Sequence, residues 1–116
     1  MLEPTDFDGQ NAVDSYGPGF FRVAGRVHHG GIVVEGDRVQ PWQGLDDLAP
    51  LQALAGRVDV LFLGLGDQIG YAPRALVTLL DGFDIRVEAM ASPTAARTYN
   101  VTLSEGRRVA CALLPL

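Results

Sequence analysis

The residues of this chain that could do chemistry gather in its last quarter, SPTAARTYNVTLSEGRRVACALLP, from Ser92 to Pro115. Hydroxyl, amide, carboxylate and guanidinium groups can bind an anion or move protons, and they can equally form a hydrogen-bonded structural lock. The sequence names no reaction, so both explanations stay open. The polar side chains concerned are those of Thr94, Arg97, Thr98, Tyr99, Asn100, Glu105 and Arg107.

A glycine loop adds a second group of candidates. Two parallel strands are predicted to end at Gly64 and Met90, next to helices that begin near Pro73 and Pro93. Both helix N-termini then face one crevice, where free amides and the helix dipole attract anions. The candidate anion or small-molecule crevice comprises Gly64, Leu65, Gly66, Asp67, Thr94, Arg97 and Thr98.

Each part of this crevice also has a structural explanation. The loop GLGDQIG has the spacing G-x-G-x-x-x-G, which differs from the dinucleotide fingerprint. A tight strand-to-helix turn needs glycine for its backbone alone. Arg97, for its part, can form an ion pair with Glu88 or with another acidic residue at a strand end.

No catalytic residue is predicted. Glu105 and Arg107 flank the glycine that ends the last helix, where their side chains can satisfy free backbone groups. Tyr99 and Leu103 are four apart and belong to one packed face. The residues retained as a structural or functional motif are Tyr16, Gly17, Gly19, Tyr99, Asn100, Glu105 and Arg107.

Metal and cofactor chemistry is not expected. His28 and His29 are adjacent and point to opposite faces of a strand. Cys111 is the single cysteine and lies in an apolar strand, so it is expected to be buried and inert. We therefore predict no metal site and no cofactor.

Composition limits the class of protein. The chain has 116 residues with 47% apolar and 20% charged side chains, which indicates one globular domain. The net charge of −5 comes largely from the first 14 residues, which argues against a nucleic-acid surface. No signal peptide is visible, and no apolar run approaches the roughly 20 residues of a membrane span. We expect a cytoplasmic protein.

The chain is predicted to have a flexible acidic arm, residues 1–11, and one domain, residues 12–116. The first part of the domain reads as short strands. One of them is predicted from Phe20 to Val27, with Phe21, Val23 and Val27 on one face, and a hairpin follows at Gly36. Trp42 is expected to close one end of the sheet.

The second half alternates strands with helices. A short helix begins near Ala49, and a second has the apolar stripe Leu76, Val77, Leu79 and Leu80. Ser92 is expected to cap the third helix, and Gly106 to end it. Together with the β-rich start, this order predicts a three-layer α/β domain with a mixed sheet.

Three segments, YGPGFFRVAG, LFLGLG and TAARTYNVTLSEGRRVACAL, resemble the small Mth-type domain family of unknown function. That family includes a mitochondrial respiratory complex I assembly factor and the adipogenesis-associated Mth-domain protein. The resemblance covers residues 12–115 and implies a roughly five-stranded mixed sheet. It also implies that the last strand, residues 108–114, is central and antiparallel to its neighbours.

Two positions depart from the family pattern. Leu65 stands where a small hydroxyl residue is usual, and Ala96 where cysteine is frequent, so chemistry that needs either side chain is absent here. The resemblance implies a non-enzymatic interaction module, an assembly or accessory factor for a membrane-associated complex. The protein partner is unidentified and would bind Phe20, Phe21, Trp42 or the hairpin if these are exposed. Membrane association would then be peripheral, through that partner, and the oligomeric state is not specified. The alternative function is small-molecule or anion binding, or weak catalysis, in the crevice.

Overall fold

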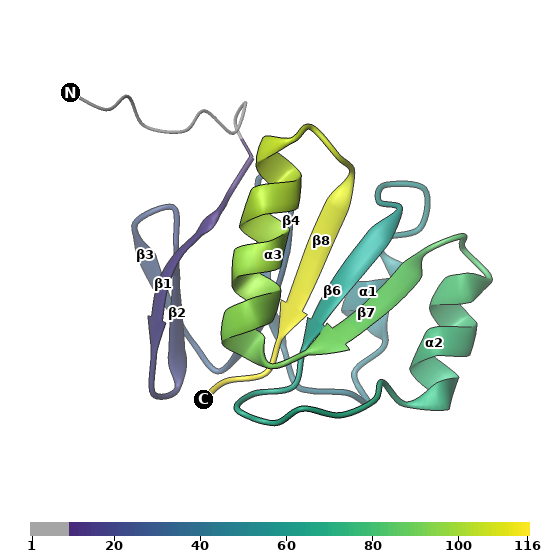
Figure 1. Ribbon diagram of the computed structural model, residues 1–116, viewed down its shortest axis with the longest axis horizontal. Coiled ribbons are helices and arrows are strands. Elements are labelled where there is room, and N and C mark those ends of the chain that lie inside the picture. The colour runs from purple at the N-terminus through teal and green to yellow at the C-terminus, as the bar shows by residue number, and fades with distance from the viewer. Residues whose placement is uncertain (1–9) are drawn as a thin grey trace.

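The computed structural model describes residues 10–116, so the predicted acidic arm lies almost wholly outside the described residues. The described chain forms two sheets and three helices (Figure 1). The elements in chain order are β1 Val13–Gly17, β2 Phe20–Val23, β3 Arg26–His29, β4 Gly31–Glu35, β5 Arg38–Trp42, α1 Ala49–Gln52, β6 Val60–Gly64, α2 Arg74–Asp81, β7 Arg86–Met90, α3 Ser92–Ser104 and β8 Val109–Leu113.

The larger sheet has five strands in the order β5-β4-β8-β6-β7. The central position expected for the last strand is confirmed. Its antiparallel direction holds against β4 but not against β6, to which β8 runs parallel. Because β7 is also parallel to β6, three strands end at one edge of the sheet, at Gly64, Met90 and Leu113.

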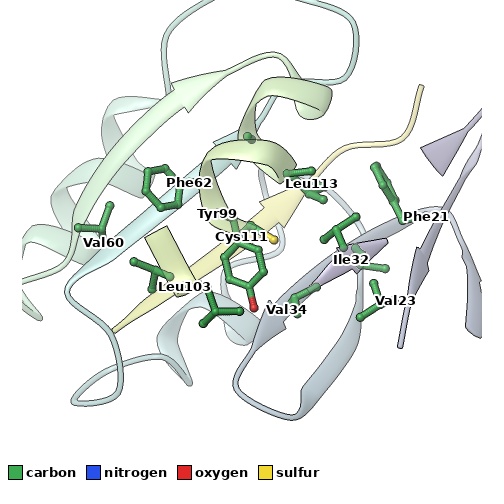
Figure 2. Close-up of a cluster of buried hydrophobic side chains, with 14 residues drawn as sticks. Phe21, Val23, Ile32, Val34, Val60, Phe62, Tyr99, Leu103, Cys111 and Leu113 are labelled. Carbon is green, nitrogen blue, oxygen red and sulfur yellow. The ribbon is translucent and has the colours of Figure 1, made fainter. Parts of the chain in front are cut away.

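Strands β6 and β8 supply side chains to two separate cores. All five residues of β8 are buried, and successive side chains of a strand point to opposite faces. Helix α3 covers one face of the sheet and α1 and α2 cover the other, so the predicted three-layer α/β architecture is confirmed (Figure 1). Figure 2 shows the core beneath α3, which includes Phe21, Val34, Phe62, Tyr99, Leu103, Cys111 and Leu113.

The smaller sheet has three antiparallel strands in the order β1-β2-β3. The sequence predicted a single strand from Phe20 to Val27, and this is wrong because a turn at Ala24 and Gly25 reverses the chain. Both turn residues have positive φ, 50° and 78°, as a two-residue hairpin loop of this type requires. Val27 consequently lies in β3 with 43% of its surface exposed, instead of on the core face.

The other predicted elements are close to those observed. The hairpin of β4 and β5 is present, and α1 begins at Ala49. In α2, Leu76 and Leu80 are buried but Val77 is 39% exposed, so the expected apolar stripe was too wide. No helix in residues 10–116 combines the length and apolarity that a membrane crossing needs.

Candidate functional site

The glycine loop meets the start of α3 at the edge where β6, β7 and β8 end. Ala91, not Ser92, occupies the N-cap position of α3, so the expected capping role of Ser92 is wrong. Instead, the buried Ser92 Oγ accepts a hydrogen bond from the Gly66 N–H (2.9 Å) and donates one to the Leu114 carbonyl (2.7 Å). One hydroxyl thereby joins the loop, the helix and the end of β8.

The backbone of this loop is bonded within the protein. The Leu65 N–H donates to the Met90 carbonyl, and the Ser92 N–H donates to the Gly66 carbonyl. A phosphate loop instead leaves such amides free for its ligand. The amides of Leu65, Gly66 and Ser92 are therefore not available to an anion.

The structure divides the crevice residues predicted from sequence. Gly64, Leu65 and Gly66 lie at the strand ends, while the Asp67 carboxylate is exposed and accepts a bond from Gln68. The Thr98 hydroxyl donates to the Thr94 carbonyl within α3. Arg97 lies on a different surface, where α3 faces β1.

That surface is a cleft of about 200 Å³, which we call the β1–α3 cleft. It brings together Arg97 and two residues of the predicted motif, Tyr16 and Asn100. The sequence placed Arg97 beside the glycine loop and did not predict its proximity to β1. The full lining is Val13, Asp14, Ser15, Tyr16, Pro93, Ala96, Arg97 and Asn100.

Two α3 side chains fasten the start of the domain to the helix. The Asn100 amide accepts a hydrogen bond from the Val13 N–H (2.9 Å) and donates one to the Val13 carbonyl (2.8 Å). The buried Tyr99 hydroxyl donates to the Asn11 carbonyl at 2.7 Å. The backbone of Asn11, the last residue of the predicted arm, is thus held against α3.

We expect Asn100→Leu to lower the free energy of unfolding by about 2 kcal/mol, because it leaves two part-buried backbone groups of Val13 without partners. Urea denaturation measures the change. Val101→Leu on the exposed side of the same helix is the matched control, with an expected change within about 0.5 kcal/mol. Equal stability of the two variants would contradict a structural role for this amide.

The alternative partner predicted for Arg97 is engaged elsewhere. Glu88 approaches Arg86 at 3.5 Å along β7. Arg97 is exposed and forms no ion pair with any residue in the described range 10–116. No described residue therefore neutralises its guanidinium, which can bind a group from another molecule.

The remaining motif residues lie at two places, the end of α3 and the turn between β1 and β2. Glu105 and Arg107 are exposed, and backbone amides, including their own, close the end of α3 by donating to Thr102 and Leu103. Gly17 borders the Phe20 ring too closely for a side chain, and Gly19 has φ of 75°. The Gly19 N–H also donates to the Leu116 carbonyl, which ties the chain's end to this hairpin.

Of the three aromatic residues expected to bind a partner, only Phe20 keeps part of its surface exposed. Phe21 and Trp42 are 0% and 2% exposed, so they belong to the cores. The most exposed large apolar side chains in the described chain are Ile69, at 91%, and Tyr71, at 97%. Neither belongs to a periodic apolar pattern; their position on either side of Gly70, ahead of Pro73, was the available signal.

Cys111 is buried and unpaired, as predicted. Burial raises the pKa of its thiol. Burial is also the main cause that raises the pKa of the Tyr99 hydroxyl, and the nearby Cys111 and Glu35 raise it further. Both groups are therefore neutral near pH 7. A neutral, buried thiol is a poor nucleophile.

Residues 13–114 match the family described as a protein of unknown function, DUF498/DUF598. An uncharacterized protein of Rhodobacter capsulatus is 51% identical over 110 residues, which cover 95% of this chain and 89% of that protein. A Mth938-like domain from Bordetella pertussis superposes with a TM-score of 0.81 at 28% identity, covering 99% of this chain and 92% of that domain.

A more distant relative carries a functional name. NADH dehydrogenase (ubiquinone) 1 alpha subcomplex assembly factor 3 of Drosophila melanogaster is 35% identical over 75 residues, 60% of this chain. The chain covers only 37% of that factor's length. On the match to residues 13–114, this chain is a member of the DUF498/DUF598 family of Mth938-like domains, whose function is unknown.

Proposed function

We propose that this protein is a non-enzymatic interaction module that binds a partner protein through the loop Asp67–Ala72. The observation that carries the proposal is the exposure of Ile69 and Tyr71, at 91% and 97%. Large aromatic and aliphatic side chains held in solvent are typical of partner-binding surfaces, and aromatic residues contribute strongly to binding energy there.

The loop is presented by a fixed base. Its first residues follow Gly66, whose amide is bonded to the buried Ser92 hydroxyl. Its last residue precedes Pro73, the N-cap of α2. Because both ends are held, binding requires less ordering of the loop and so has a lower entropic cost.

The distant similarity to an assembly factor supports the same class of function. We infer an accessory or assembly role toward a membrane-associated complex, from a cytoplasmic location and with peripheral membrane association through the partner. The residues matched in that factor are a minor part of its length, so its own partners are not assigned to this chain.

We expect the double variant Ile69→Ser, Tyr71→Ser to bind its partner about 30-fold less tightly, the effect of losing about 2 kcal/mol from a central aromatic contact. Affinity capture from a detergent-solubilised lysate would recover a stoichiometric protein with the wild type and the control variant, and much less of it with this double variant. The matched control is Val27→Ser, Val101→Ser, which removes two other exposed side chains, 43% and 54% exposed.

Equal recovery with both double variants would contradict the role of the loop, and recovery with neither the wild type nor the control would contradict the module itself. The alternative, an anion or metabolite site in the predicted crevice, has less support because the loop amides are bonded internally. A thermal shift produced by phosphate or a nucleotide would favour an anion site, and its loss in Arg97→Ala would place that site in the β1–α3 cleft and not in the predicted crevice.

A further inference from the structure

The outer edge of β1 presents free backbone groups to the β1–α3 cleft. Gly17 and Phe20 pair across the two-residue turn Pro18-Gly19, so they form a hydrogen-bonded pair. Pairs alternate along an antiparallel ladder, which makes Tyr16 and Phe21 a non-hydrogen-bonded pair. The Tyr16 N–H and C=O therefore point away from β2.

The pairing of β2 with β3 independently indicates that the Tyr16 backbone groups point away from β2. Val23 and Arg26 flank the two-residue turn of that hairpin, so Phe21 and His28 are again a hydrogen-bonded pair. The backbone groups of Phe21 thus face β3 and not Tyr16. Residues 10–116 contain no hydrogen-bond partner for the Tyr16 N–H or C=O.

Asn100 already uses the same edge as a neighbouring strand would. Its amide bonds both the N–H and the C=O of Val13, as a residue of an adjacent antiparallel strand does in a hydrogen-bonded pair. The register shifts between Val13 and Ser15, so Val13 and Tyr16 both present their backbone groups at the outer edge. From Asn100 toward Pro93 the edge is bordered by the cleft.

The cleft favours an extended chain that carries a negative charge. Arg97 lines it without an acidic partner among the described residues, while the Asp14 carboxylate is held by the Gly25 N–H at 3.0 Å. Its volume of about 200 Å³ is below the roughly 300–1,000 Å³ of small-molecule sites. A peptide strand needs only an open edge and one or two side-chain contacts.

We propose that the β1–α3 cleft binds an extended peptide segment of a partner protein, which adds to the Tyr16 edge of β1 as a fourth strand and places an acidic side chain on Arg97. Figure 1 shows β1 beside α3, and a strand here would extend the sheet β1-β2-β3. The proposal gives the interaction module a second binding surface. It rests on the proposed function in one respect, that the partner is a protein.

The test uses a displayed library of random heptapeptides selected on the full chain, followed by fluorescence anisotropy with the synthetic selected peptides. We expect the selected peptides to contain Asp or Glu. Tyr16→Pro removes the tyrosine side chain, which lines the cleft, together with an N–H that points out of the sheet, a position where proline is tolerated. Tyr16→Pro and Arg97→Ala should each weaken binding about tenfold, the effect of one charged or well-made hydrogen bond.

The matched control is Val27→Pro, on the opposite edge of the same sheet, where Val27 is in the non-hydrogen-bonded pair with Arg22. This variant and the Ile69→Ser, Tyr71→Ser variant should bind the peptides like the wild type, so failure of the loop proposal does not imply failure of this one. Because Tyr16→Pro could unfold the hairpin, hydrogen exchange of the Tyr16 amide in the wild type gives a second measurement: bound peptide should slow it.

Three results would overturn the proposal. They are the absence of any selected peptide, binding that Arg97→Ala and Tyr16→Pro leave unchanged, and a Tyr16 amide whose exchange the peptide does not slow. Complete competition by millimolar inorganic phosphate, without protection of that amide, would assign the cleft to a free anion instead.

Discussion

Gly64→Ala is expected to lower the free energy of unfolding by about 3 kcal/mol, at the upper end of what overpacking costs. An alanine Cβ at this position would lie 2.6 Å from Ser92 Oγ, 2.7 Å from Ser92 Cα and 2.9 Å from Leu113 Cδ2. All three atoms belong to buried residues, and one is backbone, so α3 itself would have to move. Urea denaturation of the variant measures the loss.

Gly70→Ala provides the matched control because it lies in the same loop with no close neighbour. The nearest atom to its added Cβ would be Leu65 Cδ1 at 3.6 Å, an ordinary contact. We expect a change within about 0.5 kcal/mol. If Gly64→Ala were as stable as Gly70→Ala, the close packing of the loop against Ser92 would be wrong, and so would the fixed base proposed for Ile69 and Tyr71.

Local sequence patterns were sufficient for most of the fold. The strands predicted to end at Gly64 and Met90 do end there, and Pro73 and Gly106 flank α2 and α3 as predicted. These features depend on neighbours in the sequence. The direction of β8 relative to β6 depends instead on which strands pair. The antiparallel direction expected for this pair was wrong, because the two strands are parallel.

The site was less predictable because its contacts join distant parts of the chain. The Ser92 hydroxyl bonds residues 26 and 22 positions away, and the Asn100 amide bonds Val13 across 87 positions. The residue types alone favoured a capping role for Ser92, which is the commoner one. Apolar character likewise did not separate the buried Phe21 from the exposed Tyr71, because exposure depends on what packs above each side chain.

Stability is expected to fall steeply in alkali because of two buried groups in one core. Burial raises the folded-state pKa of Cys111 above its ordinary 9.0 and that of Tyr99 above its ordinary 10.0. Above pH 9 the unfolded chain loses the thiol proton while the folded chain keeps it. Unfolding then releases a proton, so its free energy decreases by about 1.4 kcal/mol per pH unit, and by about 2.7 kcal/mol per unit once Tyr99 also ionises in the unfolded chain above pH 10.

Single substitutions separate the two contributions, with urea denaturation measured between pH 7 and pH 11. Cys111→Ala should remove the decrease that begins near pH 9 and leave the one near pH 10. Tyr99→Phe should do the reverse, with a constant loss of about 1 kcal/mol at every pH because the hydrogen bond to the Asn11 carbonyl is gone. A wild-type stability that is flat from pH 8 to pH 11 would mean that these groups ionise in the folded protein. That result would contradict the closed core in which α3 packs Tyr99 and Cys111 against the sheet (Figure 2).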